Sequence, residues 1–211
     1  MPKGSPELTR ARREEIINAC AKLYETMTFK NVTIKEIANF TSFTRPSIYN
    51  YFRTKEEIFL ALLQREYEGW TTDLNSLCRE HKTVSRDAFA DAFADAFARS
   101  LAERPRLLKL LSMNHYDMEI NSGPERLAEF KVVYGNTIRA VDACLKQFFP
   151  GMSAEVRDGF VFAFFPFMFG IYPYTTVSDK QKEAMKRAKV SFRFMSAYEI
   201  TYNAVIHLLG V

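Results

Sequence analysis

Apolar residues recur at helical spacing from the start of the chain. Ile16, Cys20, Leu23 and Met27 are three or four residues apart, which places them on one face of a helix. We expect this first helix to begin near Thr9.

Capping patterns mark two later helix starts. Thr33 is followed three residues on by Glu36, and Thr54 is followed in the same way by Glu57. In such a capping box the hydroxyl accepts from the backbone N–H of the third residue, and the carboxylate returns to the N–H of the first. The pattern predicts a short helix after Thr33 and a long helix after Thr54.

A third start lies between these two. Thr44 is a good N-cap, and Pro46 sits in the first turn, where its missing donor costs little. Residues 39–43 are too few for anything but a turn, so the order is short helix, turn, short helix, as in a DNA-binding helix-turn-helix. Its apolar positions are expected to pack a three-helix head: Ile34, Ile37, Ala38, Phe43, Ile48 and Phe52.

The long helix after Thr54 carries an apolar stripe that must lie against a second, larger domain. The chain has 211 residues and is 47% hydrophobic, enough for both. We place the head at residues 1–53 and the helical body at residues 54–211.

The body is expected to be helical throughout. Residues 87–98 repeat Asp-Ala-Phe-Ala three times, which indicates one amphipathic helix, and a shorter helix is expected over 106–113. A capping pair, Ser122 with Glu125, predicts a further helix to about Phe149. The next helix, from Ser153, carries phenylalanine on so many sides that it must be covered on more than one face.

The segment 115–121 is harder to assign. His115, Asp117 and Glu119 alternate, so in an extended segment they would share one side and offer metal ligands. No second cluster completes a coordination shell, and we favour a connection between two helices that lines a cavity. No metal or cofactor is expected.

Charge separates the head from the body. Residues 1–55 hold ten Lys or Arg against five Glu, so the remaining residues carry about −1 of the total +4. A basic head suits a polyanion that meets only the head. Arg10, Arg12 and Arg13 crowd the start of the first helix, where cations oppose the helix dipole, and this favours a phosphate role over a solvated turn.

Cysteine usage and hydropathy favour a cytoplasmic protein. Cys20, Cys78 and Cys144 form no CxxC pair, and we expect three small buried side chains in a reducing compartment. The N-terminus lacks a signal-peptide pattern. Residues 159–178 carry no charge but include two prolines, and a buried core helix is favoured over a membrane span.

The motifs T-I-K-E-I-A, at 33–38, and T-R-P-S-I-Y-N-Y-F-R-T-K-E-E-I, at 44–58, resemble the signature of the TetR family of transcriptional regulators. The resemblance covers Arg10 to Leu63. It departs from the family at Ser42, where a glycine is usual. A non-glycine residue held there at positive φ would cost ~1 to 2 kcal/mol.

The resemblance implies an all-α protein in which the head contacts DNA. It places four residues at base edges in the major groove, namely Thr44, Arg45, Pro46 and Ser47, and four at phosphates, namely Thr33, Tyr49, Tyr51 and Lys55. Asn50 lies among them. The planar fork of Arg45 suits the two acceptors of guanine. The alternative for Tyr49 and Tyr51 is that they only pack the head.

In the resembling family the last two helices of each chain pair with their counterparts in a four-helix dimer interface. The candidates here are Phe162, Phe167, Phe194, Tyr198, Val205 and Leu208. The body is expected to hold a cavity for a small apolar or aromatic molecule. Its candidate wall is Trp70, Phe93, Phe97, Met113, Tyr116, Phe165, Phe169 and Tyr172, the alternative being ordinary core.

These features predict a homodimeric repressor that binds a palindromic operator on double-stranded DNA and is released by a small-molecule effector. A ligand-independent DNA-binding dimer with a solid core remains open. An enzyme is the remote alternative, because His81, His115 and His207 are isolated and no phosphate loop or nucleophile motif occurs, so no catalytic residue is assigned.

Overall fold

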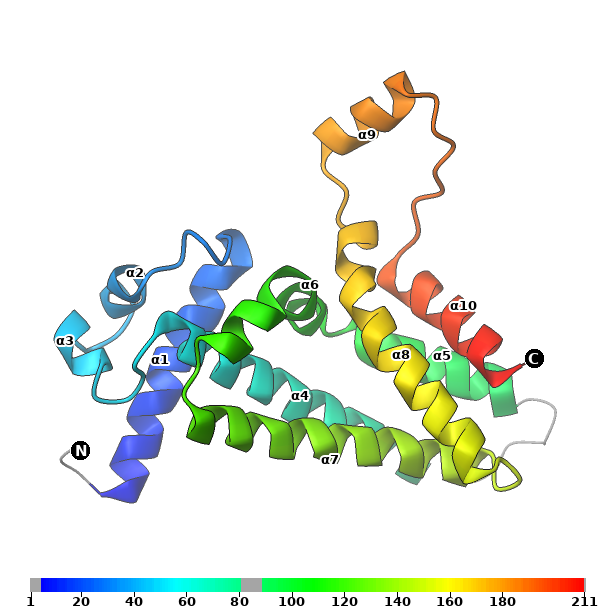
Figure 1. Ribbon diagram of the computed structural model, residues 1–211, viewed down its shortest axis with the longest axis horizontal. Helices are drawn as coiled ribbons and strands as arrows, with labels where there is room; N and C mark the ends of the chain where they lie inside the picture. Colours follow the sequence, from blue (N-terminus) through cyan, green and yellow to red (C-terminus); the bar gives the residue numbers. More distant parts are fainter. Residues whose placement is uncertain (1–4, 81–88, 211) are drawn as a thin grey trace. The chain divides into compact units, whose positions relative to one another are not determined.

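The computed structural model describes residues 5–80 and 89–210, without the side chains of residues 80, 89 and 113–115. Within these ranges the regular elements are all helices, as predicted (Figure 1). The helices are α1 (Pro6–Thr26), α2 (Ile34–Asn39), α3 (Arg45–Ile48), α4 (Lys55–Glu80), α5 (Phe89–Ala102), α6 (Pro105–Ile120), α7 (Pro124–Phe148), α8 (Ala154–Thr175), α9 (Asp179–Arg187) and α10 (Ala197–Leu209).

The chain forms two compact units. Among the described residues, the first comprises 5–67 and 113–134, and the second comprises 68–80, 89–112 and 135–210. The helix-turn-helix therefore shares its unit with the end of α6 and the start of α7, a grouping that differs from the predicted division after residue 53. Helices α4, α6 and α7 each contribute to both units.

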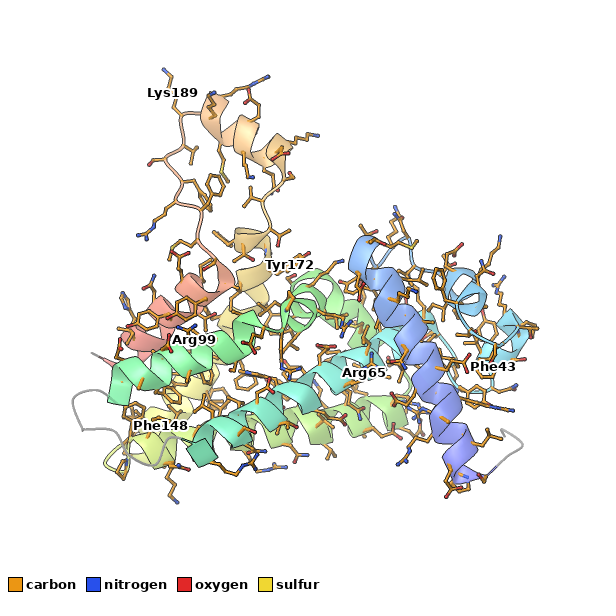
Figure 2. The ribbon with its side chains drawn as sticks, turned by 180° about the vertical axis from the view of Figure 1, so that it is seen from behind. Phe43, Arg65, Arg99, Phe148, Tyr172 and Lys189 are labelled. Atoms are coloured by element: carbon orange, nitrogen blue, oxygen red, sulfur yellow. A yellow bond between two sulfur atoms is a disulfide. The ribbon has the colours of Figure 1, made fainter. Side chains whose placement is uncertain are left out.

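In the first unit, α1 packs against the start of α4. Helix α1 begins at Pro6, earlier than predicted, because the Ser5 hydroxyl accepts from the Leu8 N–H at 3.3 Å. Ile16 and Cys20 are fully buried on its predicted apolar face. Arg65 of α4, labelled in Figure 2, donates to Asn18 at 2.5 Å.

The core of the second unit is aromatic. Trp70, Phe93 and Phe97 are fully buried, and Phe165 is 3% exposed. Trp70 meets Phe97 edge to face with ring centroids 5.7 Å apart, a favourable geometry for aromatic pairs. The Trp70 Nε1–H donates to the Ser100 hydroxyl at 3.1 Å, so the buried indole keeps a hydrogen bond.

Helix α10 packs against α5 and α8 in this unit. The Tyr198 hydroxyl donates to Asp95 of α5 at 2.6 Å, and the Tyr202 hydroxyl donates to Asp91 one turn earlier. These bonds raise the pKa of both tyrosines. Residues 87 and 88 of the sequence repeat lie outside the described residues, and the rest forms the predicted helix α5.

Two further helix boundaries, at the end of α6 and the start of α7, differ from the prediction. Helix α6 continues to Ile120, so the segment expected to connect two helices is helical, and alternating side chains on a helix do not share a side. Glu119 instead pairs with Lys131 at 2.5 Å, and the His115 side chain lies outside the described ones. Helix α7 begins at Pro124 without the Ser122 cap, because that hydroxyl donates to the Met118 carbonyl at 2.6 Å.

The cysteine prediction was wrong for one pair. Cys78 of α4 and Cys144 of α7 form a disulfide with Cα atoms 5.6 Å apart, although 66 residues separate them in sequence. No local spacing signals such a pair, because only the packing of the two helices brings the sulfurs together. Cys20 is buried, as expected.

The described part of the chain contains no group of three or more His, Cys, Asp or Glu side chains that could hold a metal ion. No single described helix is long and apolar enough to cross a membrane; α8 and α9 meet the length and composition criteria only as a pair bent by 85°.

Replacing Phe97 by alanine tests the aromatic core. Phe97 is fully buried, so its removal leaves a cavity and should lower the free energy of unfolding by about 3 to 5 kcal/mol. Tyr116→Ala is the control, because that ring is 75% exposed and its loss should change stability by less than about 0.5 kcal/mol. Equal thermal or denaturant stability of the two variants would contradict the assigned core.

Candidate nucleic-acid interface

Helix α2 begins with the Thr33 cap, which is one half of the predicted capping box. The Thr33 hydroxyl accepts from the Glu36 N–H at 3.2 Å, and the Thr33 carbonyl accepts from the Ile37 N–H at 3.0 Å. Val32 and Ile37 flank this cap and are both fully buried. The first helix of the helix-turn-helix is thereby fixed at its start and seated on the core.

The turn after α2 is held by a residue of α1. The Ser42 N–H donates to one carboxylate oxygen of Glu15 at 2.6 Å, and the Ser42 hydroxyl donates to the other at 3.2 Å. Among the described non-glycine residues only Lys189 has a positive φ. The strain predicted at Ser42 is therefore absent, and this turn needs no glycine.

Helix α3 is short and anchored by one side chain. Ile48 is fully buried, whereas Thr44, Arg45 and Pro46 on the other side are exposed. The Thr44 hydroxyl bonds the Ser47 hydroxyl at 2.9 Å and makes no bond to a backbone N–H. Thr44 thus orders the exposed edge of the helix and does not act as the side-chain cap that the sequence predicted.

The chain continues in tight turns beyond α3. Backbone bonds from Tyr51 and Phe52 return to the Ile48 carbonyl at 2.9 and 3.1 Å. Tyr49 and Asn50 project outward from this stretch, and Tyr49 is 45% exposed. The structure therefore gathers six of the predicted DNA contacts on one edge between Thr44 and Asn50; five of them are exposed, and Ser47 is partly covered.

Two of the predicted phosphate contacts already have partners within the protein. Tyr51 is only 8% exposed, and its hydroxyl accepts from Arg12 at 3.0 Å. The Lys55 ammonium donates to the Phe29 carbonyl at 2.9 Å and lies 4.3 Å from the Phe29 ring centroid. Both residues pack the head, and any phosphate contact adds to that role. Thr33, another of the predicted phosphate contacts, is exposed.

Two of the three arginines at the start of α1, Arg12 and Arg13, contact other residues of the protein. Arg13 and Arg126 lie over the Phe52 ring, 5.2 and 5.9 Å from its centroid. Glu129 bridges them, at 2.7 Å from Arg126 and 4.0 Å from Arg13. Burial, and then the charge of Arg126, lower the pKa of Arg13. Of the predicted trio only Arg10 is exposed, and Arg12 and Arg13 are half-buried.

Glu57 is the structural residue that sequence reasoning misjudged. Its N–H donates to the Thr54 hydroxyl at 3.1 Å, which is one half of the predicted capping box. Its carboxylate does not return to Thr54; it accepts from the Arg53 N–H at 2.7 Å and the Gly123 N–H at 3.1 Å. Glu57 therefore ties the end of the helix-turn-helix to the turn between α6 and α7, inside one unit. No local pattern in the sequence signals the Gly123 partner.

The predicted ligand wall is only partly assembled. Trp70, Phe93, Phe97 and Phe165 meet in the second unit, while Phe169 and Tyr172 of α8 are partly exposed. Figure 2 labels Tyr172 near the end of α8. Tyr116 belongs to the first unit and is exposed, and the Met113 side chain lies outside the described ones. The structure brings four of the eight candidates into one close-packed group.

The predicted dimer residues differ in exposure. Phe162 and Phe194 are 79% and 51% exposed, and Phe167, Tyr198 and Leu208 are partly exposed. Val205 is fully buried within its own chain, so it belongs to the core and not to a dimer surface. On a helix packed against two others, its position faces inward.

Sequence profiles of two domains match almost the whole described chain. A profile described as "Bacterial regulatory proteins, tetR family" matches residues 16–62, and one described as "Tetracyclin repressor-like, C-terminal domain" matches residues 64–211. The HTH-type transcriptional regulator HbdR of Aromatoleum sp. (strain CIB) is 33% identical over 84 residues, which span 35% of this chain and 37% of HbdR.

Solved structures share the fold at low identity. Thermus thermophilus FadR, a repressor in complex with lauroyl-CoA, has a TM-score of 0.59 and 18% identity, covering 94% of this chain and 93% of that one. FadR of Bacillus halodurans has a TM-score of 0.57 and 14% identity, covering 99% and 97%. RolR in complex with resorcinol has a TM-score of 0.58 and 15% identity, covering 95% and 96%.

Glu57→Ala tests the tie between the helix-turn-helix and the α6–α7 turn. The change leaves the part-buried Arg53 and Gly123 N–H groups without their acceptor, at about 1 kcal/mol for each, the low end of the cost for an unsatisfied donor. Amide exchange at both positions should accelerate and the unfolding midpoint should fall. The adjacent Glu56→Ala is the matched control, and equal exchange in the two variants would show that Glu57 holds nothing in place.

Proposed function

The chain belongs to the tetR family of bacterial regulatory proteins, and from this membership we propose that it is a homodimeric repressor of a palindromic operator, released by a small apolar or aromatic ligand. The observation that carries the DNA-binding part is the exposed edge of α3. There Arg45 and its neighbours project from a helix that buried Ile48 holds on the core. A rigid scaffold with polar side chains on one narrow edge fits a major groove.

Within this proposal Arg45 reads bases and other residues hold the backbone. Its guanidinium offers two parallel donors, which match the O6 and N7 acceptors of guanine. Tyr49 and Thr33 are exposed hydroxyl donors suited to phosphate oxygens. Two copies of α3 in a dimer would enter successive major grooves about 34 to 36 Å apart.

The effector part of the proposal rests on the second unit. Its aromatic residues suit an apolar or aromatic molecule, and the structures of two proteins of the same fold contain lauroyl-CoA and resorcinol. A ligand that binds better when the two heads are wrongly spaced for the operator would shift the dimer away from DNA. DNA release follows from that difference in affinity.

One observation favours a second candidate, a DNA-binding dimer without an effector. Trp70, Phe93 and Phe97 are fully buried, and the Phe97 ring contacts the other two, as in a filled core. The aromatic residues would then serve only folding and dimerisation.

Arg45→Ala tests the base-reading role. Loss of the bidentate contact should weaken operator binding by about 1 to 3 kcal/mol and relax the preference at one base pair. Lys55→Ala is the comparison: it should weaken all sequences alike and reduce the slope of log K against log salt by about one. Titrations on operator and random duplex at several salt concentrations measure both. An equal loss on both duplexes for Arg45→Ala would show that Arg45 reads no base.

Trp70, the only tryptophan, reports on effector binding. A fatty acyl-CoA or a small phenol that enters the aromatic group should change Trp70 fluorescence and weaken operator binding over the same concentration range. Trp70→Phe should lose the signal and keep the release. A compound that alters Trp70 emission while operator affinity stays constant would favour the effector-independent candidate.

A further inference from the structure

A pair of hydroxyls and a pair of sulfurs join α4 to α7 at the same spacing. The Thr71 and Thr137 hydroxyls share a hydrogen bond, with their oxygens 2.7 Å apart. Seven residues further along both helices, Cys78 and Cys144 form the disulfide. Because both partners advance by seven residues, which is close to two turns, the two helices run parallel here and keep one register. All four residues belong to the second unit, so the disulfide fixes a helix pair inside that unit.

The helix pair accommodates the two sulfurs in both oxidation states. The Cα atoms of Cys78 and Cys144 are 5.6 Å apart, within the usual range for a disulfide, so the bond can form without a shift of the helices. The Cys144 sulfur is also 3.3 Å from the Leu74 carbonyl oxygen. When the bond is open, the Cys144 thiol can donate to that oxygen, and a buried thiol packs like a small apolar side chain. The reduced pair is therefore compatible with the same fold.

The two cysteines differ in their access to solvent. Cys144 is fully buried, whereas Cys78 is partly exposed and lies two residues before the end of α4. Thiol–disulfide exchange begins when a thiolate attacks a disulfide sulfur that it can reach. Exchange with a small thiol in solution therefore begins at the Cys78 sulfur.

The exchange takes two steps. The thiolate of a small thiol such as glutathione attacks the Cys78 sulfur, forms a mixed disulfide there and releases the Cys144 sulfur as a thiolate, which takes up a proton. A second glutathione thiolate attacks the glutathione sulfur of the mixed disulfide, and the products are glutathione disulfide and the Cys78 thiolate, which is protonated in turn. In sum, two glutathione thiols and one protein disulfide give glutathione disulfide and two protein thiols. The reverse steps close the bond, with glutathione disulfide as the oxidant.

The helices that the disulfide joins also carry part of the aromatic core. Trp70 lies eight residues before the disulfide on α4, and Phe148 lies four residues after it on α7. Both rings contact α5: the Trp70 centroid is 5.7 Å from that of Phe97, and the Phe148 centroid is 5.2 Å from that of Phe93. A bond between α4 and α7 therefore holds two sides of this aromatic group together.

A closed bond makes the aromatic group harder to open. Trp70 is fully buried and Phe148 is 3% exposed, so a molecule can reach these rings only when the helices around them move apart. The disulfide lies near the C-terminal ends of both helices, where a cross-link opposes local separation. It also closes a loop across a sequence separation of 66 residues, which restricts the unfolded chain and favours the folded one.

We propose that Cys78 and Cys144 are a redox switch of the second unit. Exchange with glutathione or a similar small thiol at Cys78 opens the bond and loosens the packing of α4 and α7 around the aromatic group, and oxidation closes both again. The consequence for effector binding rests on the proposed function, in which this group receives an apolar or aromatic ligand. The reduced chain then admits that ligand more readily than the oxidised chain.

The site of exchange is tested by trapping the mixed disulfide. Cys144→Ala leaves Cys78 without its partner, so glutathione disulfide should add one glutathione to Cys78, as intact mass and peptide mapping measure. Cys78→Ser is the matched variant and should stay unmodified, because Cys144 is buried. Both variants keep Cys20, a second buried cysteine, as an internal reference. Modification of Cys144 in Cys78→Ser at the rate found for Cys78 would contradict entry through Cys78.

Equilibration of the native chain with glutathione and its disulfide separates a switch from a permanent bond. A switch should interconvert fully between the two forms, as thiol labelling measures, while circular dichroism shows the same helices in both. A bond that stays closed in reduced glutathione until the chain unfolds is purely structural. That result, or a pair that never closes in glutathione disulfide, overturns the proposal.

Acrylamide quenching of tryptophan emission measures the loosening without any effector. Trp70 is the only tryptophan and is fully buried, so its quenching constant should be low in the oxidised chain and rise severalfold on reduction. Reduction should also raise the equilibrium constant for unfolding by on the order of 100-fold. Cys78→Ser should behave as the reduced chain in either buffer, and Cys20→Ala should respond as the wild type does. Equal quenching of the oxidised and reduced wild type would show that the bond does not control the aromatic group.

Dodecanoate is the probe for the consequence in ligand binding. The reduced chain should bind it about 10-fold more tightly than the oxidised chain, because apparent affinity scales with the fraction of molecules that can admit the ligand. If both forms bind dodecanoate equally, the switch does not control entry, and the inference is wrong while the proposed effector role stands. If neither dodecanoate nor a small phenol binds either form and quenching still responds to reduction, the effector role fails and the redox switch stands.

Discussion

The helix-turn-helix depends on a buried carboxylate. Glu57 is 4% exposed, and a charge so placed is tolerated only when hydrogen bonds satisfy it. The Arg53 and Gly123 N–H groups provide those bonds, so the chain after α3 and the turn before α7 are held to the same side chain. Buried Ile48 seats α3 on the core, and the edge of α3 that carries Arg45 stays exposed. The proposed DNA contact thus depends on the apolar anchor of α3 and on the satisfied carboxylate that holds the chain after it.

The second unit is governed by a different constraint, the covering of aromatic surface. Helix α8 carries phenylalanine on several sides, and only part of it is buried by the unit's own aromatic core and by α10. What stays exposed includes Phe162. Surface of this kind is stable in water when another surface covers it. The proposed homodimer supplies that cover.

Much of the fold follows from local patterns in the sequence. The hydroxyl of Thr33 and the apolar residues Val32 and Ile37 set the start of α2 through neighbours no more than five residues away, so their roles were readable in advance. Contacts between residues distant in sequence could not be predicted in this way. The partners Glu57 and Gly123, and the disulfide between Cys78 and Cys144, are 66 residues apart in each case. Which side chains remain exposed, such as Tyr116 in contrast to Phe97, likewise depends on packing that no periodicity reveals.

Selection from a pool of randomised duplex DNA with the purified full chain tests whether two copies of α3 read one DNA site together. We expect enrichment of a two-fold symmetric sequence whose half-sites are centred about 10 to 10.5 base pairs apart, or a multiple of this, since each copy of α3 enters one major groove. A guanine in each half-site should be strongly preferred, as the partner of Arg45. Recovery of sequences with no symmetry and no preference over the starting pool would contradict the account.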